Sequence, residues 1–360
     1  MNIKYTSGLF AALVLVLSHN AYCLPSESIV FDSKTGNYII TYLGYDDTGE
    51  SDMPTVSRQA IFVPATKIDP VIQSTFKFSN GEKIPYSYRV RNGIRARQSL
   101  SMLLFDPVSD IDSSIPLPKN VEDINPNTIE QYFSVAADAL VSPNGWVGQV
   151  TASSAGGLRI GWININTSLS VSGISVGAVR GGFGFSSKDI PGIGVTQLQG
   201  EAPVRGFVDE GPTGEVADEL EKLTQNDFIT RFAAVPTIAV SNPFDATVLL
   251  NRIRDHVATW PAKQLLDPAY AAQLSRYLVA AAEAYRLNNT KAGKEHIKTI
   301  RKMLAKEHHN LDRDDEGDED TEEHKAATRL TIDRLAARVL DFDLRYVLKR
   351  MEPVEDEAHH

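Results

Sequence analysis

The sequence predicts an α+β multidomain protein, in which an N-terminal Ig-like antiparallel β-sandwich is followed by a C-terminal helical bundle. Many short alternating runs with frequent turn signals fill residues 24–200, as is typical of a sandwich. Apolar residues at helical spacing fill residues 242–350. Between them, residues 201–241 carry prolines and short helical patterns, so we expect a linker there.

The β region shows its strands through turn chemistry. Asn80-Gly81 is the strongest hairpin signal in the chain, and Asn92-Gly93 marks a second turn. Residues 128–140 interrupt the strands with a short helical pattern. The expected strands are 38–43, 75–78, 86–90, 98–105, 146–151 and 158–164, with two further strand-like runs around residues 181–185.

Helical patterns follow at residues 215–223 and 228–232, and from Asn242 the pattern is helical almost throughout. Asp267-Pro268 predicts an N-cap and a first-turn proline, and Asn288-Asn289 predicts a break between two helices. Because amphipathic helices of this length are marginal alone in water, we expect them to pack together as a bundle. Residues 351–360 are expected to form a disordered tail.

Residues 1–23 are expected to be a signal peptide. Lys4 precedes an apolar core at residues 9–17, and Ala21 and Cys23 place small side chains at the −3 and −1 positions of a cleavage site. That core is too short to span a bilayer, and we expect no membrane span elsewhere. The mature chain is therefore expected to be secreted or periplasmic. Whether Cys23 is cleaved off or lipidated stays open.

Cysteine and histidine usage exclude several kinds of site. Cys23 is the only cysteine, so a mature chain starting at Leu24 has no disulfide, thiol nucleophile or cysteine-ligated zinc. Apart from His19, every histidine lies at or beyond His256. The β region alone therefore holds neither a Ser-His-Asp triad nor a histidine-ligated metal.

The negative charge of the chain is concentrated in one short segment near its C-terminus. Of the formal charge of −10, residues 312–323 carry −8, from nine carboxylates and one arginine. No basic face in the remaining sequence points to nucleic acid as a partner.

The acidic segment resembles a single EF-hand calcium loop. Six acids fall at ligand positions, with Gly317 at the turn position, and helical patterns lie on both sides. The resemblance implies calcium as the cofactor and an oxygen ligand set. The ligands would be Asp312, Asp314, Glu316, Asp318, Asp320 and Glu323.

A second interpretation of this segment stays open. It departs from the EF-hand pattern at Glu316 and Glu319, and the chain has no second such loop. In a plain solvated connector, Asp320 would cap the following helix and Glu323 would be its capping-box partner.

Sugar chemistry is a further alternative. Two carboxylates suffice for glycoside hydrolysis, and the candidates in the β region are Asp46, Asp47, Glu82 and Asp106. Trp146 and Trp162 would stack on sugar rings if exposed, although burial is the usual state of tryptophan on a strand.

Residues 267–350 resemble the FIMAH-type helical modules of secreted bacterial proteins. The matching features are Leu274, Leu278, the run Ala280-Ala281-Ala282-Glu283-Ala284, Asn288-Asn289, Lys291-Ala292 and Ile297-Lys298-Thr299-Ile300. The resemblance implies an accessory or interaction module and carries over no catalytic residue.

Together these observations favour an exported, non-enzymatic binding or structural protein of the bacterial periplasm or cell exterior. Its partner would be an extracellular or periplasmic protein or glycan. The alternatives are a carbohydrate-binding or carbohydrate-active protein that uses the β-sandwich, and a calcium-responsive protein that uses the acidic segment.

Overall fold

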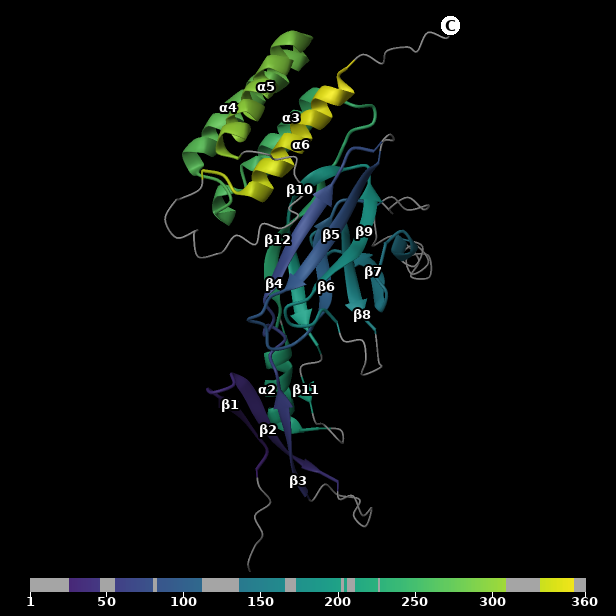
Figure 1. The fold of residues 1–360 in the computed structure, drawn as a ribbon, viewed down its shortest axis with the longest axis vertical. Helices are drawn as coiled ribbons and strands as arrows, with labels where there is room; N and C mark the ends of the chain where they lie inside the picture. The colour runs from purple at the N-terminus through teal and green to yellow at the C-terminus, as the bar shows by residue number, and fades with distance from the viewer. Residues whose placement is uncertain are drawn as a thin grey trace, which may run out of the picture. The chain divides into compact units, whose positions relative to one another are not determined.

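The structure is a computed structural model, which describes residues 26–45, 56–79, 83–111, 136–165, 173–201, 204–205, 211–225, 227–308 and 331–352. The protein is α+β: antiparallel sheets precede helices α3–α6 along the chain (Figure 1). It divides into two compact units. Unit 1 is Met1–Val63 with Val204–Lys222, and unit 2 is Pro64–Pro203 with Leu223–His360.

Unit 1 holds a four-stranded antiparallel sheet with one buried face. Ile40, Tyr42 and Phe62 are almost fully buried on that face. The carboxylate of Glu27 accepts hydrogen bonds from Leu43 N (3.1 Å) and Thr213 N (3.0 Å), which ties β2 to the start of α2. The elements, in sheet order, are β1 (Ser28–Asp32), β2 (Asn37–Gly44), β3 (Val56–Phe62) and β11 (Val204–Arg205), with helix α2 (Gly214–Thr224).

Unit 2 holds two antiparallel sheets. The smaller has the order β4 (Pro70–Phe76), β5 (Ile84–Asn92), β9 (Val179–Ser187). The larger has the order β12 (Ile229–Ile238), β10 (Ile190–Gly200), β6 (Leu100–Val108), β8 (Leu158–Asn164), β7 (Trp146–Ala152).

Aromatic side chains from both sheets meet in one core. The ring of Tyr88 on β5 lies 4.4 Å from that of Phe105 on β6, and Trp162 on β8 contacts Phe183 on β9 at 5.7 Å. Strand β5 alternates strictly between buried and exposed residues, as expected for a strand with one face in a core. The strands predicted at 86–90, 98–105, 146–151 and 158–164 fall on β5, β6, β7 and β8, whereas the strand predicted at 75–78 lies earlier in the chain and ends at Phe76.

The four long helices begin where their capping residues predict. Asp245, Asp267, Asn289 and Asp333 each accept a backbone N–H of the first turn through the side chain, which satisfies groups that a helix start leaves unpaired. The helices are α3 (Ala246–Val257), α4 (Pro268–Arg286), α5 (Thr290–Glu307) and α6 (Arg334–Arg350).

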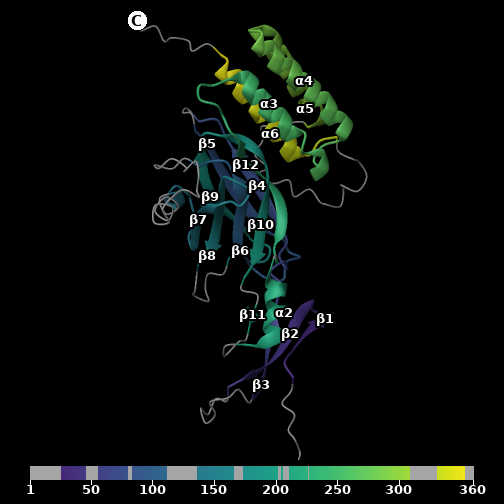
Figure 2. The ribbon, with the colours of Figure 1, turned by 180° about the vertical axis from the view of Figure 1, so that it is seen from behind.

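Helices and sheets of unit 2 share one hydrophobic core. Helix α6 is buried along most of its length, and Phe342 lies 5.1 Å from Phe76 and 4.4 Å from Phe78. Helices α3–α6 gather beside β10 and β12 in both views (Figures 1 and 2).

One expectation needs correction. The helical pattern at residues 228–232 is wrong: this stretch begins strand β12, which pairs with β10 from Ile238 back to Ile229. The local pattern of this stretch is ambiguous between helix and strand, and pairing with β10 makes it a strand. The expected linker at 201–241 therefore contains a strand. Strand β11 pairs with β3, so residues 204–205 join the sheet of unit 1. Residues 128–135 of the expected short helix lie outside the described residues.

Candidate functional site

Asn92 organises the loops at one end of unit 2. Its side chain is fully buried and donates to the carbonyls of Gln98 (2.8 Å) and Ile174 (3.0 Å), while its Oδ1 accepts from Asp69 N (3.0 Å). Its backbone N donates to Ala178 O (3.0 Å). One amide side chain thus fastens three chain segments, which we call the Asn92 loop cluster: residues 64–70, 91–98 and 173–179.

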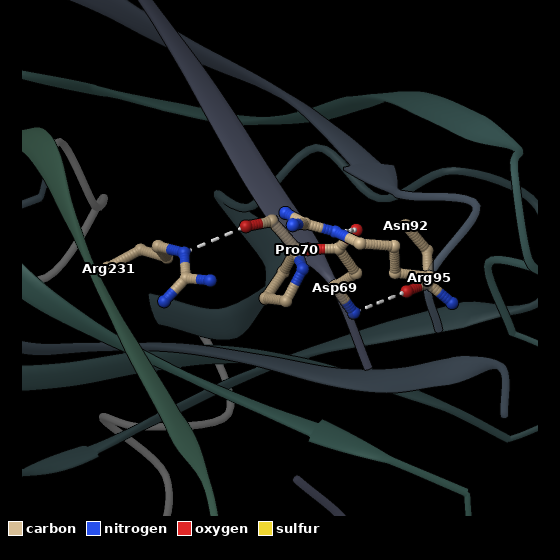
Figure 3. Close-up of polar contacts among 5 residues, drawn as sticks. All are labelled: Asp69, Pro70, Asn92, Arg95 and Arg231. Atoms are coloured by element: carbon tan, nitrogen blue, oxygen red, sulfur yellow. Dashed lines mark hydrogen bonds and ion pairs between the residues drawn. The ribbon is translucent and has the colours of Figure 1, made fainter. Parts of the chain in front are cut away.

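Further polar contacts fix the same segments (Figure 3). Arg95 Nε lies 3.3 Å from Asp69 Oδ2, and Arg231 Nε donates to Pro70 O (2.9 Å). Gly93 N donates to Asp69 O (2.7 Å), and a Cβ at residue 93 would collide with the Asp69 carboxylate. Glycine is therefore needed at this close approach.

The cluster presents apolar side chains to solvent on this fixed frame. Ile94 is 85% exposed, the largest value among the exposed large hydrophobic residues of the described chain. Val176 and Val179 are also exposed, and Gly177 lies close to the Ile94 side chain. Apolar groups held in place on a surface favour binding, because little conformational entropy is lost when a partner covers them.

Arginines lie on both sides of Ile94 in the sequence. Arg91, Arg95 and Arg97 are exposed, and Asp69 is the only acid in residues 64–70 and 91–98. Arginine is enriched at the energetically important centres of protein interfaces. The cluster therefore combines two features of an interface, exposed aliphatic groups and guanidinium groups, on a preorganised backbone.

The Asn92-Gly93 turn is predicted by the sequence, but this cluster is not. The signal present in the sequence is the run Arg91-Asn92-Gly93-Ile94-Arg95-Ala96-Arg97, a tight turn that carries three arginines and an isolated isoleucine. The hydrogen bond from Asn92 to Ile174 spans 82 residues and has no local signature.

The predicted calcium ligands lie outside the described residues: Asp312, Asp314, Glu316, Asp318, Asp320 and Glu323. The residues that flank the segment are described. His308 Nε2 lies 2.8 Å from Ile332 O, and Asp333 N donates to Leu265 O (2.8 Å). The chain on the two sides of the segment is thus brought together, and calcium binding stays a prediction.

Melting with calcium and with a chelator tests that prediction. If the segment binds calcium, the ion at about a hundred times its dissociation constant adds about 2.7 kcal/mol to the folded state. We then expect a higher melting temperature in calcium, and no shift for the double variant Asp312→Ala/Glu323→Ala. An equal melting temperature in calcium and chelator would identify the segment as a connector without a site.

Of the residues predicted for sugar chemistry, the structure describes Trp146, Trp162 and Asp106. Trp146 and Trp162 are buried, so neither offers a face to a sugar ring. Asp106 pairs with Arg159 at 2.6 Å, and Asp46, Asp47 and Glu82 lie outside the described residues.

His256 on α3 is a buried histidine in a structural role. Its Nε2 accepts a hydrogen bond from Ile193 N on β10 (2.7 Å), and Lys263 Nζ donates to Ile193 O (3.0 Å). Burial, with a contribution from the nearby Lys263 charge, lowers the pKa of His256 from 6.5 to about 4. The neutral ring therefore joins a helix to a strand.

Helix α6 carries two buried acids with different surroundings. Asp341 Oδ1 pairs with Arg301 Nε (2.7 Å) and its Oδ2 with Arg345 Nε (3.0 Å). Asp343 is buried with Oδ1 unpartnered, and burial raises the pKa of its carboxyl well above the usual range. Both side chains are almost fully buried, so we assign both to the packing of α6.

Among the residues that the structure describes, no cluster of three or more His, Cys, Asp or Glu side chains could hold a metal ion. None of the described helices combines the length and apolar character needed to cross a membrane. Comparison with known proteins finds no matching family model, no matching curated protein and no matching solved structure.

Proposed function

We propose that this chain is an exported, non-enzymatic binding protein that captures a protein partner through the Asn92 loop cluster. The observation that carries the proposal is Ile94, fully presented to solvent on a loop whose backbone is fixed by a buried amide. Export rests on the signal-peptide pattern of residues 1–23, in which Lys4 precedes the apolar segment at residues 9–17 and Ala21 and Cys23 precede the expected cleavage site.

The chemistry of the cluster favours binding over catalysis. It holds no histidine or cysteine, and its acid, Asp69, faces Arg95. A partner that fits would offer an apolar pocket for Ile94 with carboxylates at its edge for the arginines. A protein surface supplies both more readily than a glycan does, because no exposed tryptophan accompanies the cluster.

We also propose a finer architecture for the sheets and helices of unit 2. Interleaved aromatic rings support an Ig-like β-sandwich for the two sheets of unit 2. Helices α3–α6 would form a bundle, with an accessory or interaction role as the FIMAH-type resemblance implies. In this view the rigid sheets hold the loop cluster, as scaffolds commonly hold binding loops.

A retention experiment tests the binding proposal. The chain from Leu24 onward is immobilised and exposed to the extracellular and periplasmic fractions of the source cells. We expect a saturable protein partner that is retained at least about tenfold less well by Ile94→Asp, because loss of a central apolar anchor costs more than about 1.4 kcal/mol of binding free energy.

The matched control is Val147→Asp, an exposed valine on β7 that also gains a charge. It should retain the partner as the unaltered chain does. Equal retention by all three chains, or retention of glycan alone on an array, would contradict the proposal.

A further inference from the structure

The exposed side of α5 carries a stripe of lysines. The helix buries Gly293, Ile297, Ile300 and Leu304 along one side. The opposite side holds five lysines spaced three or four residues apart, which places them on one side of the helix. They are Lys291, Lys294, Lys298, Lys302 and Lys306, which we call the α5 lysine stripe.

The stripe stands out against the charge of the whole chain. Four of its lysines are exposed and Lys294 is half-buried, in a protein whose formal charge is −10. Glu295 is the acid within the stripe and pairs with Lys298 at 2.9 Å. The stripe therefore keeps a positive charge along about 22 Å of helix, taken from fifteen residues at 1.5 Å each.

We propose that the α5 lysine stripe docks unit 2 onto an anionic phospholipid bilayer surface. A straight helix side lets all five ammonium groups approach a flat plane together. Lysine is a flexible point charge that suits the diffuse potential of such a surface. Because the apolar side of α5 is buried in the core, the contact is electrostatic and involves no insertion of that face.

Two other anionic partners fit less well. Single-stranded nucleic acid would need aromatic rings between the cations for base stacking, and the only ring of α5, His296, packs against Tyr277 on α4 at 6.4 Å. An acidic protein surface would favour the planar fork of arginine, which binds a carboxylate through two hydrogen bonds. The stripe holds lysine at every position.

Vesicle sedimentation tests the proposal. Residues 9–17 would themselves insert into a bilayer, so the chain is used from Leu24 onward, which keeps every described residue. The vesicles are phosphatidylcholine with about 30% phosphatidylglycerol, or phosphatidylcholine alone. We expect binding to the anionic vesicles at about 0.05 M salt, loss of binding at about 0.5 M salt, and no binding to the neutral vesicles.

Charge-matched variants locate the effect. Each lysine near an anionic leaflet contributes roughly fivefold to partitioning, so four substitutions should weaken binding about a hundredfold or more. The stripe variant is Lys291→Gln/Lys294→Gln/Lys302→Gln/Lys306→Gln, and it leaves the Lys298–Glu295 pair intact. The control variant removes four exposed cations elsewhere: Lys34→Gln/Arg89→Gln/Lys188→Gln/Arg276→Gln.

The proposal is supported if the control variant binds within about threefold of the unaltered chain and the stripe variant does not bind. Circular dichroism checks that both variants keep their helices. The proposal is overturned if the unaltered chain ignores anionic vesicles at low salt, or if both variants lose binding equally. It is also overturned if the unaltered chain binds single-stranded DNA more tightly than vesicles.

Discussion

Replacing Asn92 by alanine is expected to destabilise unit 2 by about 3 kcal/mol or more. The substitution leaves Asp69 N and the carbonyl of Gln98 without their partner, while the carbonyl of Ile174 keeps the hydrogen bond from Leu100 N. An unsatisfied buried polar group costs roughly 1–3 kcal/mol, and two such groups are affected in one place. Urea unfolding followed by tryptophan fluorescence measures the effect, because Trp146, Trp162 and Trp260 all lie in unit 2.

Arg89→Ala is the matched control for this prediction. Arg89 lies on the same strand but is exposed, so its loss should change the free energy of unfolding by less than about 0.5 kcal/mol. Hydrogen exchange should show that Asn92→Ala exposes the amides of the Asn92 loop cluster first. A loss below about 1 kcal/mol, or a uniform increase in exchange, would show that Asn92 does not organise the loops.

Unit 2 should lose stability in mild acid because of His256. A pKa lowered from 6.5 to about 4 means that the folded state binds this proton less readily than the unfolded state. The contribution to stability is therefore complete above pH 6.5 and is lost as the pH falls toward 4. At about 1.4 kcal/mol per pH unit, the loss reaches about 3 kcal/mol.

The structural cause is the hydrogen bond that Nε2 accepts from Ile193 N. A proton on Nε2 turns the acceptor into a donor, and Lys263 adds positive charge beside it. In His256→Gln, the amide oxygen would replace Nε2 as the acceptor without titrating. We expect this variant to show a stability curve flatter by about 3 kcal/mol between pH 7 and 4.

His296→Gln serves as the control, since His296 lies on α5 away from the β10 contact. It should keep the pH dependence of the unaltered chain. Parallel curves for the unaltered chain and His256→Gln would mean that other groups cause the acid sensitivity.

Local signals in the sequence were enough for most individual elements. Asp267-Pro268 and Asn288-Asn289 predicted the start of α4 and the break before α5, because caps act within a few residues. Gly156 and Gly157, both with positive φ, lie in the turn between β7 and β8. Such features depend on backbone sterics, which adjacent residues determine.

Features that depend on distant pairing were not predicted. Strand β12 pairs with β10 along nearly its full length, and only this pairing distinguishes it from a short helix. The two-residue strand β11 pairs with β3 after about 140 intervening residues. Because of this pairing, β11 belongs to unit 1, although the strands before and after it in the sequence belong to unit 2.

The candidate site was missed for a related reason. A tight turn with three arginines is common on protein surfaces, and its rigidity comes from Asp69, Gln98 and Ile174, which lie on separate segments. Conversely, the acidic segment dominates the sequence, but its six predicted ligands lie outside the described residues. A dense run of charged residues predicts a segment exposed to solvent. A buried amide side chain instead forms hydrogen bonds that hold the surrounding backbone in place.

Site-specific photo-crosslinking at residue 94 tests the binding proposal most directly. A photoreactive residue replaces Ile94 in one chain and Val147 in another, and both chains are expressed in the source cells and irradiated. We predict a discrete protein adduct from position 94 that is absent from position 147 and is lost when Arg95→Glu and Arg97→Glu are added. The same adducts from both positions, or none from position 94 in a chain that is exported and folded, would contradict a partner-binding role for the Asn92 loop cluster.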